Sequence, residues 1–345
     1  TYLYGDNGVW EAVTAACSKR RVRGIFKTTS REQRLMFEAS PTGLVRNPNV
    51  WRLLWRGLRL RPADFALGGD RDPELLGDLA HPFAYVEDVS NRLETLEAAL
   101  VERSDRRAVF LTVYTELTAQ AAREIAAGSF DDPEWMCRYL VRFAEHYRRA
   151  FVGFERGEYA DVPDPWLVAF GSAVGGDALV IQDAFLGINA HIVYDLALAL
   201  SAIGLDPGRE TKYADHRRID AILARLVAVQ RELLAERYAP GLEAVGEGMG
   251  GLDERWSTST LRRAREFAWR TAVVRTDARW STVRSSTGWL LSRTATGGAS
   301  VLLSPTASPS TMRTLRAIEA TEFELESYAR AFHGRAVDGG ASIER

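Results

Sequence analysis

The amino-acid sequence predicts an all-α protein, a multi-helix bundle around one central buried helix at about residues 178–203. The 3.6-residue apolar period of amphipathic helices dominates the middle of the chain. Runs that alternate apolar and polar residues, which would predict strands, are scarce. Residues 178–203 carry Leu, Ile, Val, Phe and Ala around the whole helical circumference, which is typical of a helix buried on every side.

Three parts of the chain are expected to differ in organisation. Residues 1–80 hold short helical pieces separated by turn-forming residues, and they predict an N-terminal extension packed on the main domain. Residues 81–335 form the helical domain, and residues 336–345 are expected to be a disordered tail. Apolar periodicity within the domain predicts helices at 86–104, 108–127, from 133, from 164, 178–203, 215–238, 261–274 and 311–332. The stretch 285–310 is rich in Ser, Thr, Gly and Pro and predicts a loop.

Composition excludes several classes of protein. The formal net charge of −2 argues against general nucleic-acid binding, which requires a strongly basic face. Cys17 and Cys137 are the two cysteines, and they predict neither a disulfide framework nor a cysteine zinc site. The first residues lack the pattern of a secretion signal. The expected location is therefore the cytoplasm.

The stretch 46–62 reads as a basic amphipathic helix. Trp51, Leu54, Trp55 and Leu58 fall on one stripe, arginines lie on another side, and no acid interrupts them. Such a helix would contact an anionic membrane surface or guard the mouth of a site. In the alternative interpretation, its tryptophan face docks on the domain.

Asp131 and Asp132 resemble the start of a magnesium-binding motif of terpene cyclases, but the neighbouring residues favour helix capping. Pro133 suits the first helical position, which makes Asp132 the N-cap and Glu134 a first-turn acid.

Five polar side chains interrupt the central helix: Gln182, Asp183, Asn189, His191 and Asp195. On an ideal helix Gln182 and Asn189 lie within about 20° of each other, and His191 and Asp195 lie on the roughly opposite side. Burying an imidazole or a carboxylate is costly unless the group finds a partner. The pattern indicates either a polar cavity or a hydrogen-bonded network that fixes helix register.

His191 and Asp195 are the candidate catalytic pair, with Asp195 orienting His191 for proton transfer. Gln182, Asp183 and Asn189 are the candidate substrate-binding polar groups. Aromatic residues are expected to line an apolar pocket, namely Trp135, Tyr139, Phe143, Trp166 and Trp269. No cofactor is required by this reading, although His146, His191 and Asp195 would suit a divalent metal.

The order of several segments resembles a known family. "VFLTVYTELT", "FDDPEWMCRYLVRFAEHYRRAF", "PWLVAFGSA", "LGINAHIVYDLALAL" and "EFAWRTAV" follow one another as in the domain-of-unknown-function family numbered 5995. The resemblance covers roughly residues 85–320, and its most specific element is Asn-Ala-His-Ile-x-x-Asp at 189–195. It implies a helical protein and carries no activity, but it marks Asn189, His191 and Asp195 as a family signature.

These residues favour a small-molecule enzyme of the cyclisation, dehydration or isomerisation type, acting on a largely hydrophobic or amphipathic substrate. A non-catalytic ligand-binding or scaffolding protein is the first alternative. A terpene-cyclase-like or metal-dependent enzyme using the same cavity is the second.

Overall fold

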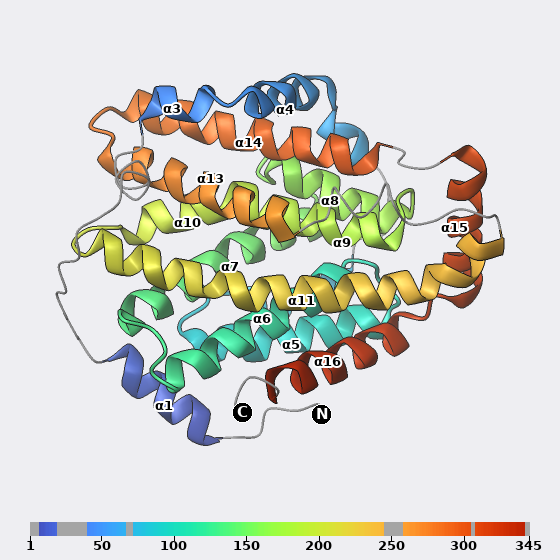
Figure 1. Cartoon of the computed structure of the whole chain (residues 1–345), viewed down its shortest axis with the longest axis horizontal. Coiled ribbons are helices and arrows are strands. Elements are labelled where there is room, and N and C mark those ends of the chain that lie inside the picture. The colour runs from blue at the N-terminus through green and yellow to red at the C-terminus, as the bar shows by residue number, and fades with distance from the viewer. Residues whose placement is uncertain (1–6, 19–39, 67–71, 245–257, 305–307, 342–345) are drawn as a thin grey trace.

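The chain folds into stacked helices, and the computed structural model describes residues 7–18, 40–66, 72–244, 258–304 and 308–341 (Figure 1). Every element in these ranges is helical, which confirms the predicted all-α class. The main helices are α1 (Asn7–Cys17), α3 (Pro41–Val45), α4 (Pro48–Arg59), α5 (Val86–Glu102), α6 (Ala108–Ala126), α7 (Pro133–Glu155), α8 (Asp164–Gly175), α9 (Val180–Asn189), α10 (Leu196–Ile203), α11 (Arg209–Ala244), α13 (Thr258–Asp277), α14 (Ser281–Leu303), α15 (Pro309–Glu322) and α16 (Leu325–Ala341). Short 3-10 turns occupy η1 (Pro62–Phe65) and η2 (Pro73–Leu76).

The predicted central helix is confirmed. Helix α9, the π-helical segment η3 (Ala190–Asp195) and α10 follow one another without a break, and they pack against α6, α7, α8, α13 and α14. By length and composition alone this Val180–Ile203 run could cross a membrane, but 61% of its most apolar window is buried inside the bundle. A core helix passes the same test, so the run is weak support for a membrane span.

The predicted loop at 285–310 is wrong, because α14 occupies most of it. Its small residues allow close helix packing instead of breaking the helix. A Cβ on Gly297 would lie 1.9 Å from the backbone oxygen of Leu53, and one on Gly57 would lie 2.1 Å from that of Arg293. Helices α4 and α14 therefore touch backbone to backbone, and only glycine permits this approach.

Helix α4 confirms the predicted helix within 46–62, but not the docking of its tryptophan face. Val50, Leu54 and Gly57 are buried against the bundle. Trp51 and Trp55 point outward, and 52% and 62% of their surface is exposed. The sequence placed Leu54 on the same stripe as both tryptophans, whereas the contact with α14 lies to one side of that stripe.

The beginning of α7 is capped as predicted. Asp132 Oδ1 accepts a hydrogen bond of 3.0 Å from the Trp135 backbone N–H, with Pro133 in the first turn. Asp131 forms an ion pair with Arg218. Both aspartates therefore have structural partners.

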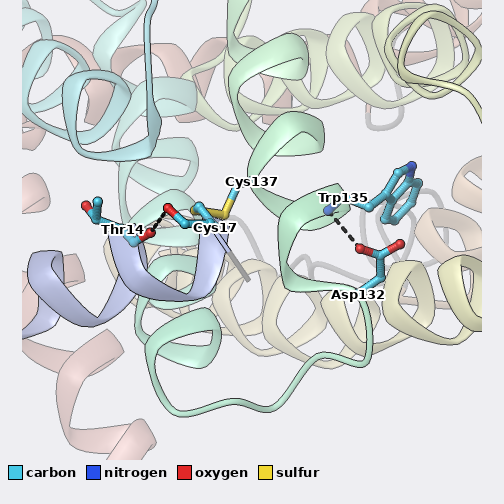
Figure 2. The surroundings of a disulfide bond; sticks show 6 residues. Thr14, Cys17, Asp132, Trp135 and Cys137 are labelled. Carbon is cyan, nitrogen blue, oxygen red and sulfur yellow. Dashed lines mark hydrogen bonds between the residues drawn. A yellow bond between two sulfur atoms is a disulfide. The ribbon is translucent and has the colours of Figure 1, made fainter. Parts of the chain in front are cut away.

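One turn further along α7, Cys137 forms a disulfide with Cys17 of α1, 120 residues earlier in the chain (Figure 2). The sequence predicted no disulfide framework, and the structure has this one disulfide. The bond ties the N-terminal helix to the main helical domain. Because the two cysteines are bonded, they do not support a reducing compartment, and the cytoplasmic location stays a prediction.

The C-terminal part differs from the single predicted helix at 311–332. Two helices, α15 and α16, form there, and α16 continues to Ala341. Leu325, Tyr328, Phe332 and Ala336 are buried at helical spacing, which carries the apolar stripe of α16 beyond residue 335. The predicted disordered tail therefore contains helix up to Ala341, and residues 342–345 lie outside the described part.

Candidate functional site

The π-helical segment η3 holds the predicted catalytic pair in the centre of the bundle. His191 and Asp195 are 2% and 1% exposed. Isolated π-helical turns inside α-helices are frequent at functional sites. Just before this segment, Gly187 lets the Phe110 ring of α6 pack directly on the helix, because a Cβ there would lie 2.4 Å from the ring. Glycine at this position therefore brings α6 close to the central helix.

Hydrogen bonds hold His191 and Asp195 in place through Nδ1 of the imidazole and Oδ2 of the carboxylate. His191 Nδ1 lies 2.9 Å from Asp195 Oδ2, and the Trp166 indole Nε1 donates a 2.8 Å hydrogen bond to the same oxygen. Trp166 belongs to α8, so the carboxylate is held by two helices. The tautomer and the orientation of the imidazole are thereby coupled to Asp195.

Three polar atoms at this place have no hydrogen-bond partner among the described residues. They are His191 Nε2, Asp195 Oδ1 and Tyr147 Oη, and all are buried. The Tyr147 ring packs against the His191 ring with 6.3 Å between centroids. Each unsatisfied buried polar group costs about 1–3 kcal/mol, so three of them together need an explanation.

Burial shifts the titration of both members of the pair toward their uncharged forms. It lowers the pKa of His191 well below its usual value, and nearby His146 adds to this effect. Burial also raises the pKa of Asp195 well above its usual value, although the Trp166 hydrogen bond opposes the shift. Perturbed pKa values of this kind are concentrated at functional sites.

Aromatic rings enclose the imidazole. Phe143 stacks on His191 at 3.5 Å between centroids, and Tyr114 meets it edge-on at 4.5 Å. Phe110 and Trp166 complete the contacts at 5.8 and 5.9 Å. Phe143 and Trp166, two of the predicted wall residues, thus contact His191, and their role in binding a substrate stays a prediction.

The remaining aromatic candidates belong to an adjoining cluster. The Tyr139 hydroxyl lies 3.2 Å from His216 Nδ1, and Trp135 Nε1 donates to the Gly204 backbone oxygen. Trp269 packs on Trp135 and His216. These residues are one layer away from His191, and Tyr139 connects the two groups through its contact with Phe143.

The other three polar residues of the central helix hold neighbouring helices. Gln182 Nε2 donates to the Leu302 backbone oxygen at 2.7 Å, and Asn189 Nδ2 donates to that of Ala295 at 2.8 Å. Both acceptors belong to α14. Asp183 accepts from the Ser172 hydroxyl of α8, and burial raises its pKa to about 7. The hydrogen bonds of Gln182, Asp183 and Asn189 therefore go to α14 and α8 and not to His191 or Asp195.

The candidate metal set is not assembled. Within the described ranges, no group of three or more His, Cys, Asp or Glu side chains is placed to hold a metal ion. His146 lies on α7, and a positive charge on its ring would help to lower the pKa of His191. Burial, with help from Arg142 and Arg149, lowers the pKa of His146 to about 4.

A second histidine, His333 of α16, lies between two carboxylates. His333 Nε2 lies 2.8 Å from Glu97 and Nδ1 lies 3.4 Å from Glu116. Burial alone would lower the pKa of His333, but the hydrogen bonds to the two carboxylates outweigh it and raise the pKa to about 10. These residues line a groove of about 1180 Å³ along α5, α6 and α16. No local signal in the sequence points to it, because the carboxylates come from α5 and α6.

The fold and the signature at 189–195 define a helical protein with a buried His–Asp pair. The chain belongs to the family described as "Family of unknown function (DUF5995)", which matches residues 86–305. Comparison with curated proteins and with solved structures found no match.

Proposed function

We propose that this protein is an acid–base enzyme that acts on a small, largely apolar molecule, with His191 as the proton-transfer group and Asp195 as its orienting partner. The observation that carries the proposal is the set of three unsatisfied buried atoms, His191 Nε2, Asp195 Oδ1 and Tyr147 Oη. Single unpaired atoms also occur elsewhere in the bundle, such as Trp269 Nε1, and what supports the proposal is that three of them belong to His191, its partner Asp195 and the adjacent Tyr147.

The geometry is suited to proton transfer in either direction. When the proton between the pair lies on His191 Nδ1, Nε2 is a bare acceptor and serves as the base. When Nε2 takes a proton from the substrate, the Nδ1 proton can move to Asp195 Oδ2, and the Nε2–H formed in this way then serves as the acid. Burial raises the pKa of Tyr147, so its hydroxyl stays protonated and can donate to a polar group of the substrate. One base and one acid at the same place suffice for isomerisation, dehydration or cyclisation without net redox change.

The aromatic residues around His191 indicate the class of substrate. Phe110, Tyr114, Phe143 and Trp166 surround the imidazole and offer mainly apolar surface. Because His191 is 2% exposed, access requires that one of these rings move aside. The substrate is expected to be small and to carry few polar groups.

The test uses deuterium from the solvent. The full chain is incubated in D₂O with a lipid-soluble metabolite extract, and mass spectrometry follows compounds that gain deuterium or disappear. We expect conversion by the wild type, loss of conversion in His191→Gln and at least a partial loss in Tyr147→Phe. His333→Gln is the matched control and retains conversion.

Circular dichroism confirms that each variant is folded. Conversion that persists in folded His191→Gln would overturn the proposal.

The alternative is a non-catalytic ligand-binding or scaffolding protein. It is favoured by the observation that Gln182, Asp183 and Asn189 all serve helix contacts. If apolar compounds bind to the protein and are recovered unchanged, with no deuterium gained, this alternative replaces the enzyme.

A further inference from the structure

Helix α4 presents an apolar ridge to the outside of the molecule. Trp51, Trp55 and Leu58 stand at i, i+4 and i+7, and they are 52%, 62% and 55% exposed. The helix cannot turn to bury them, because Gly57 holds its other side in backbone contact with α14. Contiguous exposed apolar side chains of this size mark interaction sites.

Basic side chains surround the ridge. Arginines at 46, 52, 56, 59 and 61 are all exposed, and residues 41–63 contain no acid. Among the described residues, none of the five has a carboxylate within ion-pair distance. Exposed arginines of α16, such as Arg330 and Arg335, do pair with glutamates. Within the part of the chain that the structure describes, no ion pair therefore compensates the positive charge beside the ridge.

Two arginine contacts keep this charge close to the ridge. The Arg59 guanidinium lies over the Trp55 ring, 5.8 Å from its centroid. Arg56 donates to the hydroxyl of Ser304, the residue that follows α14. The apolar and the basic parts thus form one continuous surface.

We propose that α4 docks the protein on an anionic lipid surface, with Trp51, Trp55 and Leu58 entering the headgroup region and the arginines contacting lipid phosphates and carboxylates. Tryptophan favours the membrane interface, and an amphipathic helix with a basic flank binds in the plane of that interface. Helices α3 and α4 lie at one outer edge of the described part of the molecule, opposite α16 (Figure 1). A second copy of the chain fits less well, because it would bring like charges together.

The experiment measures co-flotation of the full chain with vesicles of phosphatidylcholine alone or mixed with phosphatidylserine. Binding is expected with the mixed vesicles, weak with phosphatidylcholine alone, and reduced by salt because screening weakens the arginine contribution. Trp55→Ser/Leu58→Ser removes exposed apolar surface and no hydrogen bond that holds the fold. It is expected to reduce binding about tenfold or more. Arg52→Gln/Arg56→Gln/Arg59→Gln should remove the preference for phosphatidylserine.

Matched controls separate the site from general effects. Trp280→Ser removes a tryptophan that is 72% exposed outside α4. Arg313→Gln/Arg330→Gln/Arg335→Gln removes the same charge from α15 and α16. Both controls are expected to bind like the wild type.

Three results would overturn the proposal. The first is no binding to mixed vesicles, and the second is binding that the α4 variants leave unchanged. The third is vesicle-independent self-association that Trp55→Ser/Leu58→Ser abolishes, which would assign the ridge to a second copy of the chain. The enzyme proposal is independent of all three, because it is read from conversion in D₂O.

Discussion

Two histidines of this protein each contact carboxylates, yet their surroundings give them opposite properties. His191 has one carboxylate partner, one unpartnered ring nitrogen and almost no exposed surface. His333 has a carboxylate at each nitrogen, and 26% of its side chain is exposed beside the groove. Burial lowers the pKa of His191, whereas Glu116 and Glu97 raise the pKa of His333 to about 10 despite its own burial.

The difference shows how the same residue type can be held uncharged with one nitrogen unpaired, or held charged between two partners. A buried imidazole without a second partner stays neutral and keeps one nitrogen for chemistry. An imidazolium between two carboxylates stays charged and joins helices, here α16 to α5 and α6. Changes at the two sites should therefore have different consequences for activity and for stability.

The largest effect is expected from Asp195→Asn. The amide keeps the shape but holds the His191 tautomer less well, so turnover should fall by about 10²- to 10⁴-fold. Stability should be unchanged or slightly higher, since a desolvated carboxylate is replaced by a neutral group. The measurements are conversion in the D₂O assay and thermal unfolding. Full activity together with a strong loss of stability would make Asp195 a structural residue.

The second effect is the pH dependence of His333. Its pKa is about 10 in the folded protein and about 6.5 in the unfolded chain, so its stabilising contribution is complete below about pH 6.5 and is lost as the pH rises through 10. The contribution should be about 2–4 kcal/mol. Urea unfolding between pH 6 and 10 should show the wild type losing this stability, and His333→Gln should lack it at every pH.

Asp183 also titrates in this range, because burial raises its pKa to about 7. It is present in both proteins, so subtracting the stability profile of His333→Gln from that of the wild type leaves the contribution of His333. His191→Gln is the contrasting variant, because burial lowers the pKa of His191 and gives no such loss at alkaline pH. Profiles that stay parallel for wild type and His333→Gln would show that His333 is not held charged.

Periodicity and local capping predicted much of the fold. The central helix, α5, α6 and the Asp132 cap could be read locally because each depends on neighbours within a few residues. Helix α14 could not be read in this way. Its Gly, Ser and Thr residues allow close contact with α4 and the central helix. Composition alone cannot distinguish a closely packed helix of this kind from a loop.

The candidate site was also predicted only in part, because local features can be read from the sequence and long-range contacts cannot. The cost of burying His191 and Asp195 is visible in the sequence, because an apolar helix surrounds them. The partners are not visible, since Trp166 lies 29 residues from Asp195 and Glu97 lies 236 residues from His333. The sequence therefore identified the polar groups whose burial costs free energy, but not which of them find hydrogen-bond partners in the fold.

On the central helix, Asn189 has a hydrogen-bond partner whereas His191 Nε2 has none. A double-mutant cycle of Asn189 and Gly298 is expected to give the smallest of the predicted effects. Asn189→Ala removes the hydrogen bond to Ala295 and should cost about 1 kcal/mol. Gly298→Ala should also destabilise, because the new Cβ would lie 2.4 Å from Asn189 Oδ1. In the double variant this clash is gone and alanine favours the helix, so the costs should not add. Chemical denaturation measures the four stabilities. All three variants should keep turnover, and an Asn189→Ala protein that is stable but inactive would return Asn189 to the substrate-binding role that the sequence predicted.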